Sequence, residues 1–240
     1  TSPAESITFR HISSSSFDQP VSDSVYVQSV TLTCVSDLPA DCGSGGEVTP
    51  LNQRRTLVSS GTERTWVLEL PSSYDPDVAS DVVFNLHGRG SNGVQQRVYG
   101  DFRDLAEADN VIMVYPDALA GDGGTRQWQS RQSVSTVEFD FIDDLADLIS
   151  AEYCTDRFFA AGMSSGGAMS TGLACDADTR FEAFGPVTFG FYIEEECADA
   201  GPRPIIYFHG TEDNTVPFEG FGGEDFPPVP EMMQRWADHN

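Results

Sequence analysis

"FFAAGMSSGGAMSTGLAC", residues 158–175, places a serine at a glycine-rich corner between two elements of different kinds. The apolar residues that come before the corner are typical of a buried strand, and a helix pattern follows it. Residues 162–166 match G-x-S-x-G, in which the glycines allow a tight turn around Ser164. A serine there would lie at a helix N-terminus, where free N–H groups favour a developing oxyanion. The alternative interpretation is a glycine-rich turn with a capping serine.

Strand and helix patterns alternate on both sides of this corner. Short apolar runs predict strands at residues 64–70, 81–88, 111–117, 157–162, 181–189 and 203–210. Helical periodicity predicts one helix over 95–110, with Val98, Phe102, Leu105 and Ala106 on its buried face. A second helix over 138–153 places Phe139, Ile142, Leu145, Ala146 and Ile149 on one stripe, and residues 231–240 predict a closing helix. This alternation predicts an α/β fold, with a mostly parallel sheet covered by helices on both faces and ligands bound at the carboxyl ends of the strands.

Two further loops follow predicted strands and would lie at the same edge of the sheet. In "NLHGRGSNG" (85–93), the backbone N–H of Arg89 is suited to share an oxyanion with the N–H of Ser165. His87 lies inside that motif, so we expect it to hold the loop in shape rather than to take a proton. An ordinary strand-to-helix turn is the alternative for this loop.

In "YFHGTEDNTVP" (207–217), Asp213 follows a strand end and comes after Ser164 in the chain. The order serine, acid, histidine makes Asp213 the expected orienting acid of a catalytic triad. Glu212 and Asp225 are the other candidates, and a turn aspartate that caps local backbone is the plain alternative.

A general base is needed to remove the proton of Ser164, and none stands at the expected place. The chain has four histidines, His11, His87, His209 and His239, and none follows Asp213 on a loop beyond a further strand. We expect the base to lie beyond Asn240 in a chain that is shortened here. The alternatives are that His239 serves as the base or that the protein is inactive.

Composition restricts the class of protein and its partners. The 240 residues carry a net charge of −25, and all 13 basic residues are arginine. Such a field repels phosphate backbones and anionic lipids, so neither nucleic acid nor a membrane is an expected partner. Plain solubility and a saline habitat are both compatible with this surface. Residues 1–44, with a predicted strand at 24–32, are an N-terminal extension or the tail of a preceding module, and residues 45–240 form the main domain.

The cysteines show no C-x-x-C pair and no zinc spacing, which leaves free thiols or disulfides and favours an oxidising compartment. Cys154 begins the strand before Ser164 and Cys175 ends the helix after it, so both return to the bottom of the sheet and a disulfide between them is geometrically reasonable. A Cys34–Cys42 disulfide would close a short loop.

Taken in order, several segments resemble the secreted feruloyl esterases and the related polyhydroxybutyrate-depolymerase-like esterases of the α/β-hydrolase fold. They are "LHGRGSNG" (86–93), "VYPDALAG" (114–121), "YCTDRFFAAGMSSGGAMSTGLAC" (153–175), "FEAFGPVTFGFY" (181–192), "RPIIYFHGTEDNTVPFEG" (203–220) and "VPEMMQRWADHN" (229–240). The resemblance covers roughly residues 40–240. It implies ester hydrolysis through an acyl-enzyme, with Ser164 as nucleophile, Asp213 as acid and no metal or organic cofactor. It also implies a base histidine some tens of residues after a closing W-x-x-x-N-G-C, of which this chain has Trp236 and Asn240, and it leaves Cys42 or Cys197 without a partner.

The resemblance also implies a range of substrates. The first is feruloylated plant or algal polysaccharide, the second a polyhydroxyalkanoate or similar polyester, and the third acetylated xylan. Trp128, His87 and Gly88 are the candidates for substrate contact. Trp128 stands where many relatives carry several tryptophans and would stack on an aromatic acyl group, or it is a core or lid residue. A binding module that kept the hydrolase fold and lost catalysis is the rival from another class of protein, and the oligomeric state stays open.

Overall fold

The computed structural model describes residues 42, 54–121, 123–222 and 226–240. The chain groups into residues 1–37 and 38–240, and all described residues belong to the second unit. The predicted strand at 24–32 and Cys34 lie outside the described residues. The proposed boundary between residues 44 and 45 stays a prediction.

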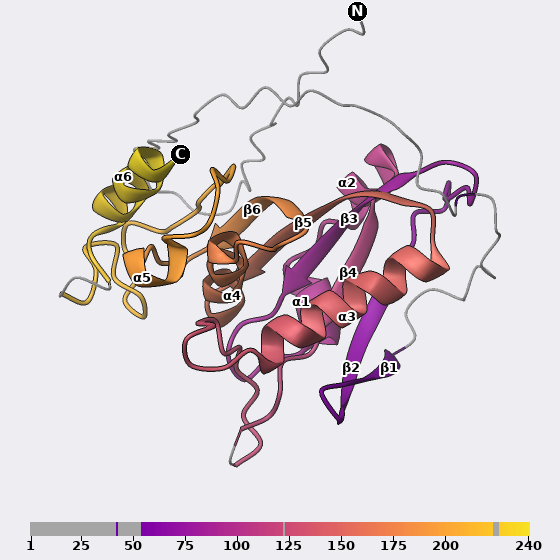
Figure 1. Ribbon diagram of the computed structural model, residues 1–240, viewed down its shortest axis with the longest axis horizontal. Coiled ribbons are helices and arrows are strands. Elements are labelled where there is room, and N and C mark those ends of the chain that lie inside the picture. Colours follow the sequence, from indigo (N-terminus) through magenta and orange to yellow (C-terminus); the bar gives the residue numbers. More distant parts are fainter. Residues whose placement is uncertain (1–41, 43–53, 122, 223–225) are drawn as a thin grey trace, which may run out of the picture. The chain divides into compact units, whose positions relative to one another are not determined.

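A six-stranded sheet forms the centre of the described unit, in the order β1-β2-β4-β3-β5-β6 (Figure 1). β3, β4, β5 and β6 run parallel, whereas β1 and β2 form an antiparallel hairpin that joins the sheet through β4. The mostly parallel sheet predicted from the sequence is therefore confirmed. The strands are β1 (Arg54–Ser59), β2 (Thr62–Glu69), β3 (Ser80–Leu86), β4 (Ile112–Pro116), β5 (Thr155–Met163) and β6 (Phe181–Val187).

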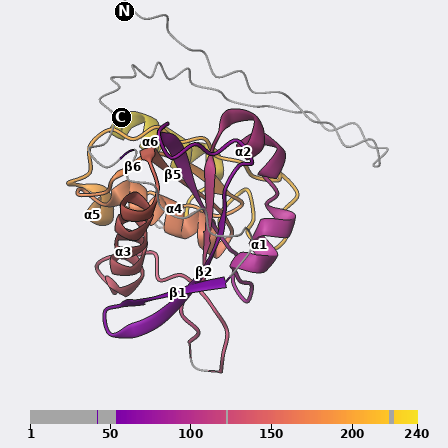
Figure 2. The same cartoon turned by 90° about the vertical axis from the view of Figure 1, so that its right-hand side faces the viewer.

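Helices cover both faces of the sheet, as the alternation of strands and helices predicts. The helices are α1 (Gly93–Tyr99), α2 (Arg103–Asp109), α3 (Val137–Glu152), α4 (Ser165–Cys175), α5 (Glu194–Cys197) and α6 (Val229–His239). Figure 2 shows α3 on one side of the sheet and α1 and α2 on the other. Successive side chains of β3 point to opposite faces of the sheet, as in any strand. Val82 and Phe84 join the large core under α3 and α4. Val83 packs with Met113 and Tyr115 on the side of α1 and α2.

α3 buries the stripe that its periodicity predicts. Phe139, Ile142, Leu145, Ala146 and Ile149 are all at most 3% exposed. Their spacing places them on one face, which packs against the large core. Within the described residues, no helix has both the length and the apolar composition needed to cross a bilayer.

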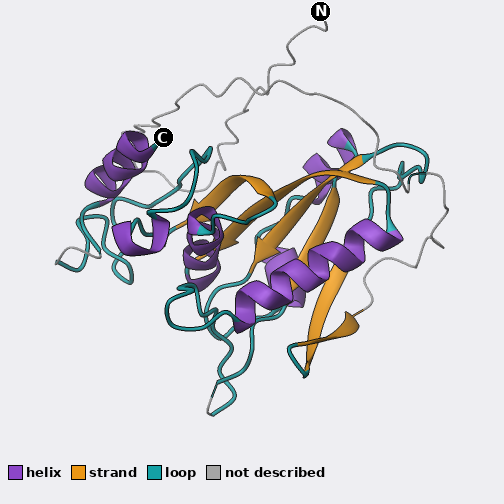
Figure 3. Ribbon diagram, viewed as in Figure 1, coloured by secondary structure: helices purple, strands orange, loops and turns teal. Residues whose placement is uncertain are grey.

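The single helix predicted over 95–110 is wrong. The chain forms two short helices, α1 and α2, separated at Gly100 (Figure 3). Asn85 of β3 donates to Gly100 O at 2.9 Å and accepts from Gln96 Nε2 at 2.7 Å, so polar contacts hold this corner against the sheet. Of the predicted apolar face only Ala106 is buried; the exposed members are Val98, Phe102 and Leu105.

Residues 203–210 do not form the regular strand that their apolar pattern predicts. Two isolated parallel bridges, Phe184↔Ile205 and Val187↔Phe208, hold the segment beside β6. Between these bridges, Pro186 of β6 has no N–H to donate to Ile206 O, which interrupts the ladder. The segment still runs along the sheet edge, so it carries the following loop to the carboxyl ends of the strands. β1 and the short helix α5 were not predicted from the sequence.

Both predicted disulfides are wrong. Cys42 pairs with Cys154, with Cα atoms 4.8 Å apart, and Cys175 pairs with Cys197, with Cα atoms 4.1 Å apart. Cys42 and Cys197 therefore both have partners, against the expectation that one of them lacks its own. The position of Cys154 and Cys175 at the bottom of the sheet was not enough to predict their partners. Cys197, at the end of α5, lies beside the end of α4 and pairs with Cys175. The two disulfides fit the oxidising compartment inferred from the sequence.

Asp143 on α3 supplies a pH-dependent contribution to stability. It is half-buried, and burial, followed by repulsion from Asp176, raises its pKa from 3.8 to about 6, although Arg180 opposes this. The folded state then binds the proton more tightly than the unfolded state does. This contribution is fully present below about pH 4 and is lost as the pH rises through about 6.

We therefore expect Asp143→Asn to raise the free energy of unfolding by about 1–2 kcal/mol at pH 8 and to change it little at pH 4. Denaturation across this pH range measures the difference, and Asp144→Asn at the exposed neighbouring position is the matched control. An equal effect of Asp143→Asn at both pH values would contradict the assignment.

Candidate active site

Ser164 stands at a strained corner between β5 and α4. Its backbone has φ 54° and ψ −118°, in a region that residues with a Cβ rarely adopt, and it is the N-cap of α4. The Ser164 N–H donates to Val187 O at 2.9 Å, and its carbonyl accepts from Ala168 N at 2.9 Å. Strain of this kind costs about 1–3 kcal/mol and collects at functional sites. A strand, a strained serine and a helix in this order form the geometry of a nucleophile elbow.

The glycines of the motif allow the elbow to lie against the end of β3. A Cβ on Gly166 would stand 2.1 Å from Leu86 O, and one on Gly162 would stand 2.5 Å from the carbonyl carbon of Gly166. A Cβ on Gly88 would stand 3.6 Å from the Cβ of Ser164. The loop that follows β3 is therefore packed directly beside the serine.

The two proposed oxyanion donors belong to the two sides of this contact. Ser165 is the first residue of α4 and is 7% exposed. Arg89 is exposed and follows Gly88, and Gly90 fixes the loop beyond it by donating to Arg126 O at 2.8 Å. The structure brings both residues within the immediate surroundings of Ser164.

His87 holds the loop after β3. Its ring is fully buried; Nε2 lies 3.0 Å from Ala118 N and Nδ1 lies 2.7 Å from Gly88 O. Because the amide can only donate, Nε2 accepts and Nδ1–H donates to the Gly88 carbonyl. Burial lowers the pKa of His87, which keeps the ring neutral. These contacts support the loop-holding role expected from the sequence, and they leave the ring no surface for substrate.

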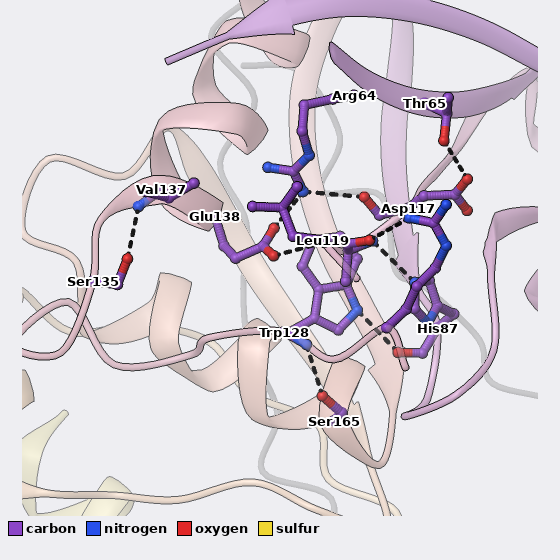
Figure 4. A network of polar contacts seen from close by, with 12 residues as sticks. Arg64, Thr65, His87, Asp117, Leu119, Trp128, Ser135, Val137, Glu138 and Ser165 are labelled. Carbon is purple, nitrogen blue, oxygen red and sulfur yellow. Dashed lines mark hydrogen bonds and ion pairs between the residues drawn. The ribbon is translucent and has the colours of Figure 1, made fainter. Parts of the chain in front are cut away.

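Trp128 lies in the core, which is one of the two alternatives left open by the sequence. It is 2% exposed, and its ring centroid lies 5.3 Å from that of His87. Its indole N–H donates to His87 O at 2.9 Å, and its backbone N–H donates to Ser165 Oγ at 3.1 Å (Figure 4). A ring with both faces covered offers no platform for an acyl group, so the interpretation of Trp128 as a stacking residue is not supported by this structure. Gly88 is buried as well.

Asp213 lies at the same sheet edge as Ser164. Val187, whose carbonyl accepts from Ser164, bridges to Phe208, and Asp213 follows on the next loop. Asp213 Oδ1 accepts from Val216 N at 2.9 Å and from Thr215 N at 2.8 Å, and these two donors lower its pKa. The group is therefore a carboxylate at neutral pH. Glu212 is exposed, and Asp225 lies outside the described residues.

The remaining described histidines have other partners. His209 Nε2 lies 2.7 Å from Val216 O and 3.9 Å from Asp213 Oδ2, and its Nδ1 lies 2.9 Å from the Tyr207 hydroxyl. His239 Nδ1 on α6 lies 3.2 Å from the Tyr192 hydroxyl. In the described part of the chain, no hydrogen bond joins a histidine to Ser164. His11 lies outside the described residues.

A buried polar network, not predicted from the sequence, lies behind these loops. Arg64 and Glu138, both almost fully buried, form an ion pair at 2.5 Å, and Glu138 Oε1 accepts from Leu119 N at 2.9 Å (Figure 4). The Asp117 carboxylate accepts from Gly93 N at 2.6 Å and from Thr65 Oγ1 at 2.5 Å. Together these contacts fix residues 117–119, whose Ala118 N–H holds His87. Two features of the sequence could have indicated this network. Arg64 begins an apolar strand pattern, and Glu138 lies next to the apolar stripe of a predicted helix.

Known proteins resemble this chain in both sequence and fold. A probable feruloyl esterase C from Aspergillus clavatus is 30% identical over 167 residues, which are 65% of this chain and 57% of that protein. Feruloyl esterase C from Emericella nidulans is equally similar, and feruloyl esterase B from Piromyces equi is 27% identical over 65% of this chain and 30% of its own length. The chain thus spans little more than half of the first two relatives. No family model matches it.

Solved structures show the same fold. A thermostable esterase superposes with a TM-score of 0.56 at 20% identity, covering 78% of this chain and 52% of its own. Esterase PE8 superposes with a TM-score of 0.55 at 20% identity, covering 71% of this chain and 82% of its own. Together with the serine corner and the sheet order, these likenesses confirm the α/β fold predicted from the sequence. The chain therefore has the α/β-hydrolase fold, and its sequence resembles those of feruloyl esterases.

Proposed function

We propose that this chain carries the nucleophile of a serine carboxylic-ester hydrolase. The observation that carries the proposal is Ser164, held at φ 54° at the N-terminus of α4 with the Gly88 loop packed beside it. Ser164 Oγ attacks the ester carbonyl and gives its proton to a base, and the N–H groups of Ser165 and Arg89 stabilise the tetrahedral oxyanion. Collapse expels the alcohol, which takes that proton. Water then attacks the acyl-enzyme, releases the acid and restores the serine.

We propose that Asp213 orients a histidine base and that this base is none of the three histidines that the structure describes. Three histidines of this chain support this by their contacts, since His87 and His209 use both ring nitrogens and His239 is bound to Tyr192. The ionised Asp213 is suited to stabilise an imidazolium. The alternative is a binding protein with the same fold and no catalytic activity, and the experiment below distinguishes the two.

The substrate that we favour is a feruloylated polysaccharide ester, because relatives at 30% identity are named feruloyl esterases. Acetylated xylan is a second candidate, since a relative from Neocallimastix patriciarum is named a bifunctional acetylxylan esterase/xylanase. A polyester substrate rests on the motif resemblance alone. Secretion is part of the same proposal, and the two disulfides support it.

Incubation with a fluorophosphonate followed by intact-mass and peptide analysis tests the proposal. We expect one adduct, mapped to Ser164. Turnover of methyl ferulate, acetylated xylan and short polyhydroxybutyrate oligomers then ranks the substrates. Neither adduct nor turnover would instead favour a binding protein, which polysaccharide or polymer pull-down would identify.

A further inference from the structure

We propose that Trp128 is a positioning residue that holds the two halves of the oxyanion site in register. The inference rests on the proposed function, because it concerns the N–H groups of Ser165 and Arg89. Trp128 contacts both sides of the nucleophile through different atoms. Its backbone N–H donates to Ser165 Oγ at 3.1 Å, and its indole N–H donates to His87 O at 2.9 Å.

The hydrogen bonds on the His87 side fix two consecutive peptide planes. The indole of Trp128 holds the carbonyl of His87, and His87 Nδ1–H holds the carbonyl of Gly88 at 2.7 Å. In a trans peptide the C=O and the following N–H point in opposite directions. Holding the Gly88 carbonyl therefore sets the direction of the Arg89 N–H, and holding the His87 carbonyl sets the plane before it.

The bond on the Ser165 side ties the first turn of α4 to the same tryptophan. Ser165 Oγ accepts from the Trp128 backbone, so the residue that follows the nucleophile is fixed relative to the loop after β3. All three residues are buried, with Ser165 7%, Trp128 2% and His87 0% exposed. An unpaired donor or acceptor would be costly there, which favours one arrangement of the three.

Figure 4 shows Trp128 between Ser165 and His87, with the Arg64–Glu138 pair and Asp117 above them in this view. Glu138 and Asp117 fix residues 117–119, and the Ala118 N–H fixes the far side of the His87 ring at 3.0 Å. The arrangement places Trp128 where a small displacement would change the relative position of both proposed oxyanion donors. Misplacement by about 1 Å at such a site can cost about a hundredfold in rate.

Two other buried tryptophans, Trp236 and Trp66, serve as controls for the loss of a buried indole N–H away from the serine. Trp236 is 1% exposed and its indole N–H donates to Phe191 O at 3.0 Å, so it is a buried tryptophan with the same kind of bond elsewhere. Trp66 is fully buried, and its indole N–H has no partner among the described residues. A phenylalanine at any of the three positions removes the indole N–H and keeps an aromatic ring.

The test compares Trp128→Phe with Trp236→Phe and Trp66→Phe in the full natural polypeptide. We expect Trp128→Phe to lower kcat for methyl ferulate and the fluorophosphonate labelling rate by about tenfold or more, with KM changed less than about threefold. It should also reduce the preference for an oxygen ester over its thionoester, because that preference reports on oxyanion contacts. Ser165→Ala should act in the same direction, and the double variant should lose less than the product of the two effects.

Amide hydrogen exchange provides a readout that does not need activity. Exchange at residues 88–90 and 165 should rise about tenfold in Trp128→Phe and stay unchanged in Trp236→Phe. If Trp128→Phe keeps kcat, the thionoester preference and the exchange rates while losing only stability, Trp128 is a core residue and the positioning role is overturned. An inactive wild type would instead contradict the proposed function, and the exchange data would still decide whether Trp128 orders both loops.

Discussion

Ser164→Ala is expected to abolish fluorophosphonate labelling and to lower kcat for esters by about 10⁴- to 10⁶-fold. Both activities are lost because alanine has no hydroxyl oxygen to attack the ester carbonyl or the phosphorus of the label. The corner itself should survive, since Ser164 holds its place through backbone bonds to Val187 and Ala168 rather than through a described side-chain hydrogen bond.

The strain at the corner gives this experiment an internal control. Glycine tolerates positive φ without a Cβ clash, so Ser164→Gly should be about 1 kcal/mol more stable than Ser164→Ala while being equally inactive. Ser72→Ala, at an exposed serine that bonds to Glu107, should change neither labelling nor turnover. Labelling that persists in Ser164→Ala would place the reactive group elsewhere and remove the basis of the proposed mechanism.

Gly166→Ala is expected to lower the free energy of unfolding by about 3 kcal/mol or more and to suppress labelling of Ser164. The added Cβ would stand 2.1 Å from Leu86 O, 2.5 Å from Leu86 C and 2.8 Å from His87 O. All three are backbone atoms of β3 and its loop, so no side chain can move aside. Relief requires α4 to move away from β3, which separates Ser164 from the Gly88 loop.

Gly201→Ala is the matched control, because a Cβ there meets no atom within 4 Å and the residue does not have positive φ. It should change the free energy of unfolding by less than about 0.5 kcal/mol. Chemical denaturation and the rate of fluorophosphonate labelling measure both effects. A stable and fully reactive Gly166→Ala would show that the close approach of α4 to β3 is not needed by the site.

The sequence alone predicted the features that depend on neighbours close in the chain. Periodicity identified α3 and five of its seven buried residues, and the short apolar runs identified β2 to β6. The glycines on both sides of Ser164 indicated the corner, because glycine lets the chain turn tightly without a Cβ clash. The motifs around His87 and Asp213 indicated loops at the carboxyl ends of strands, where the structure has them.

Local periodicity gave wrong predictions where contacts with a distant part of the chain decide the backbone conformation. The helix over 95–110 divides because Asn85, on β3, bonds to Gly100 and Gln96 and holds that corner to the sheet. The segment 203–210 follows β6 without forming a regular strand, since Pro186 of β6 has no N–H to donate to Ile206. In both cases an apolar pattern was present, and polar contacts or the backbone of proline decided the outcome.

The sequence by itself determined the class of fold, the serine corner and the candidate acid, because each depends on residue types at fixed short spacings. Only the tertiary structure decided that Cys42 pairs with Cys154 and Cys175 with Cys197, and that Trp128 lies buried between Ser165 and His87. Those outcomes depend on which elements pack together, and a single sequence carries no direct measure of distances between residues far apart in the chain.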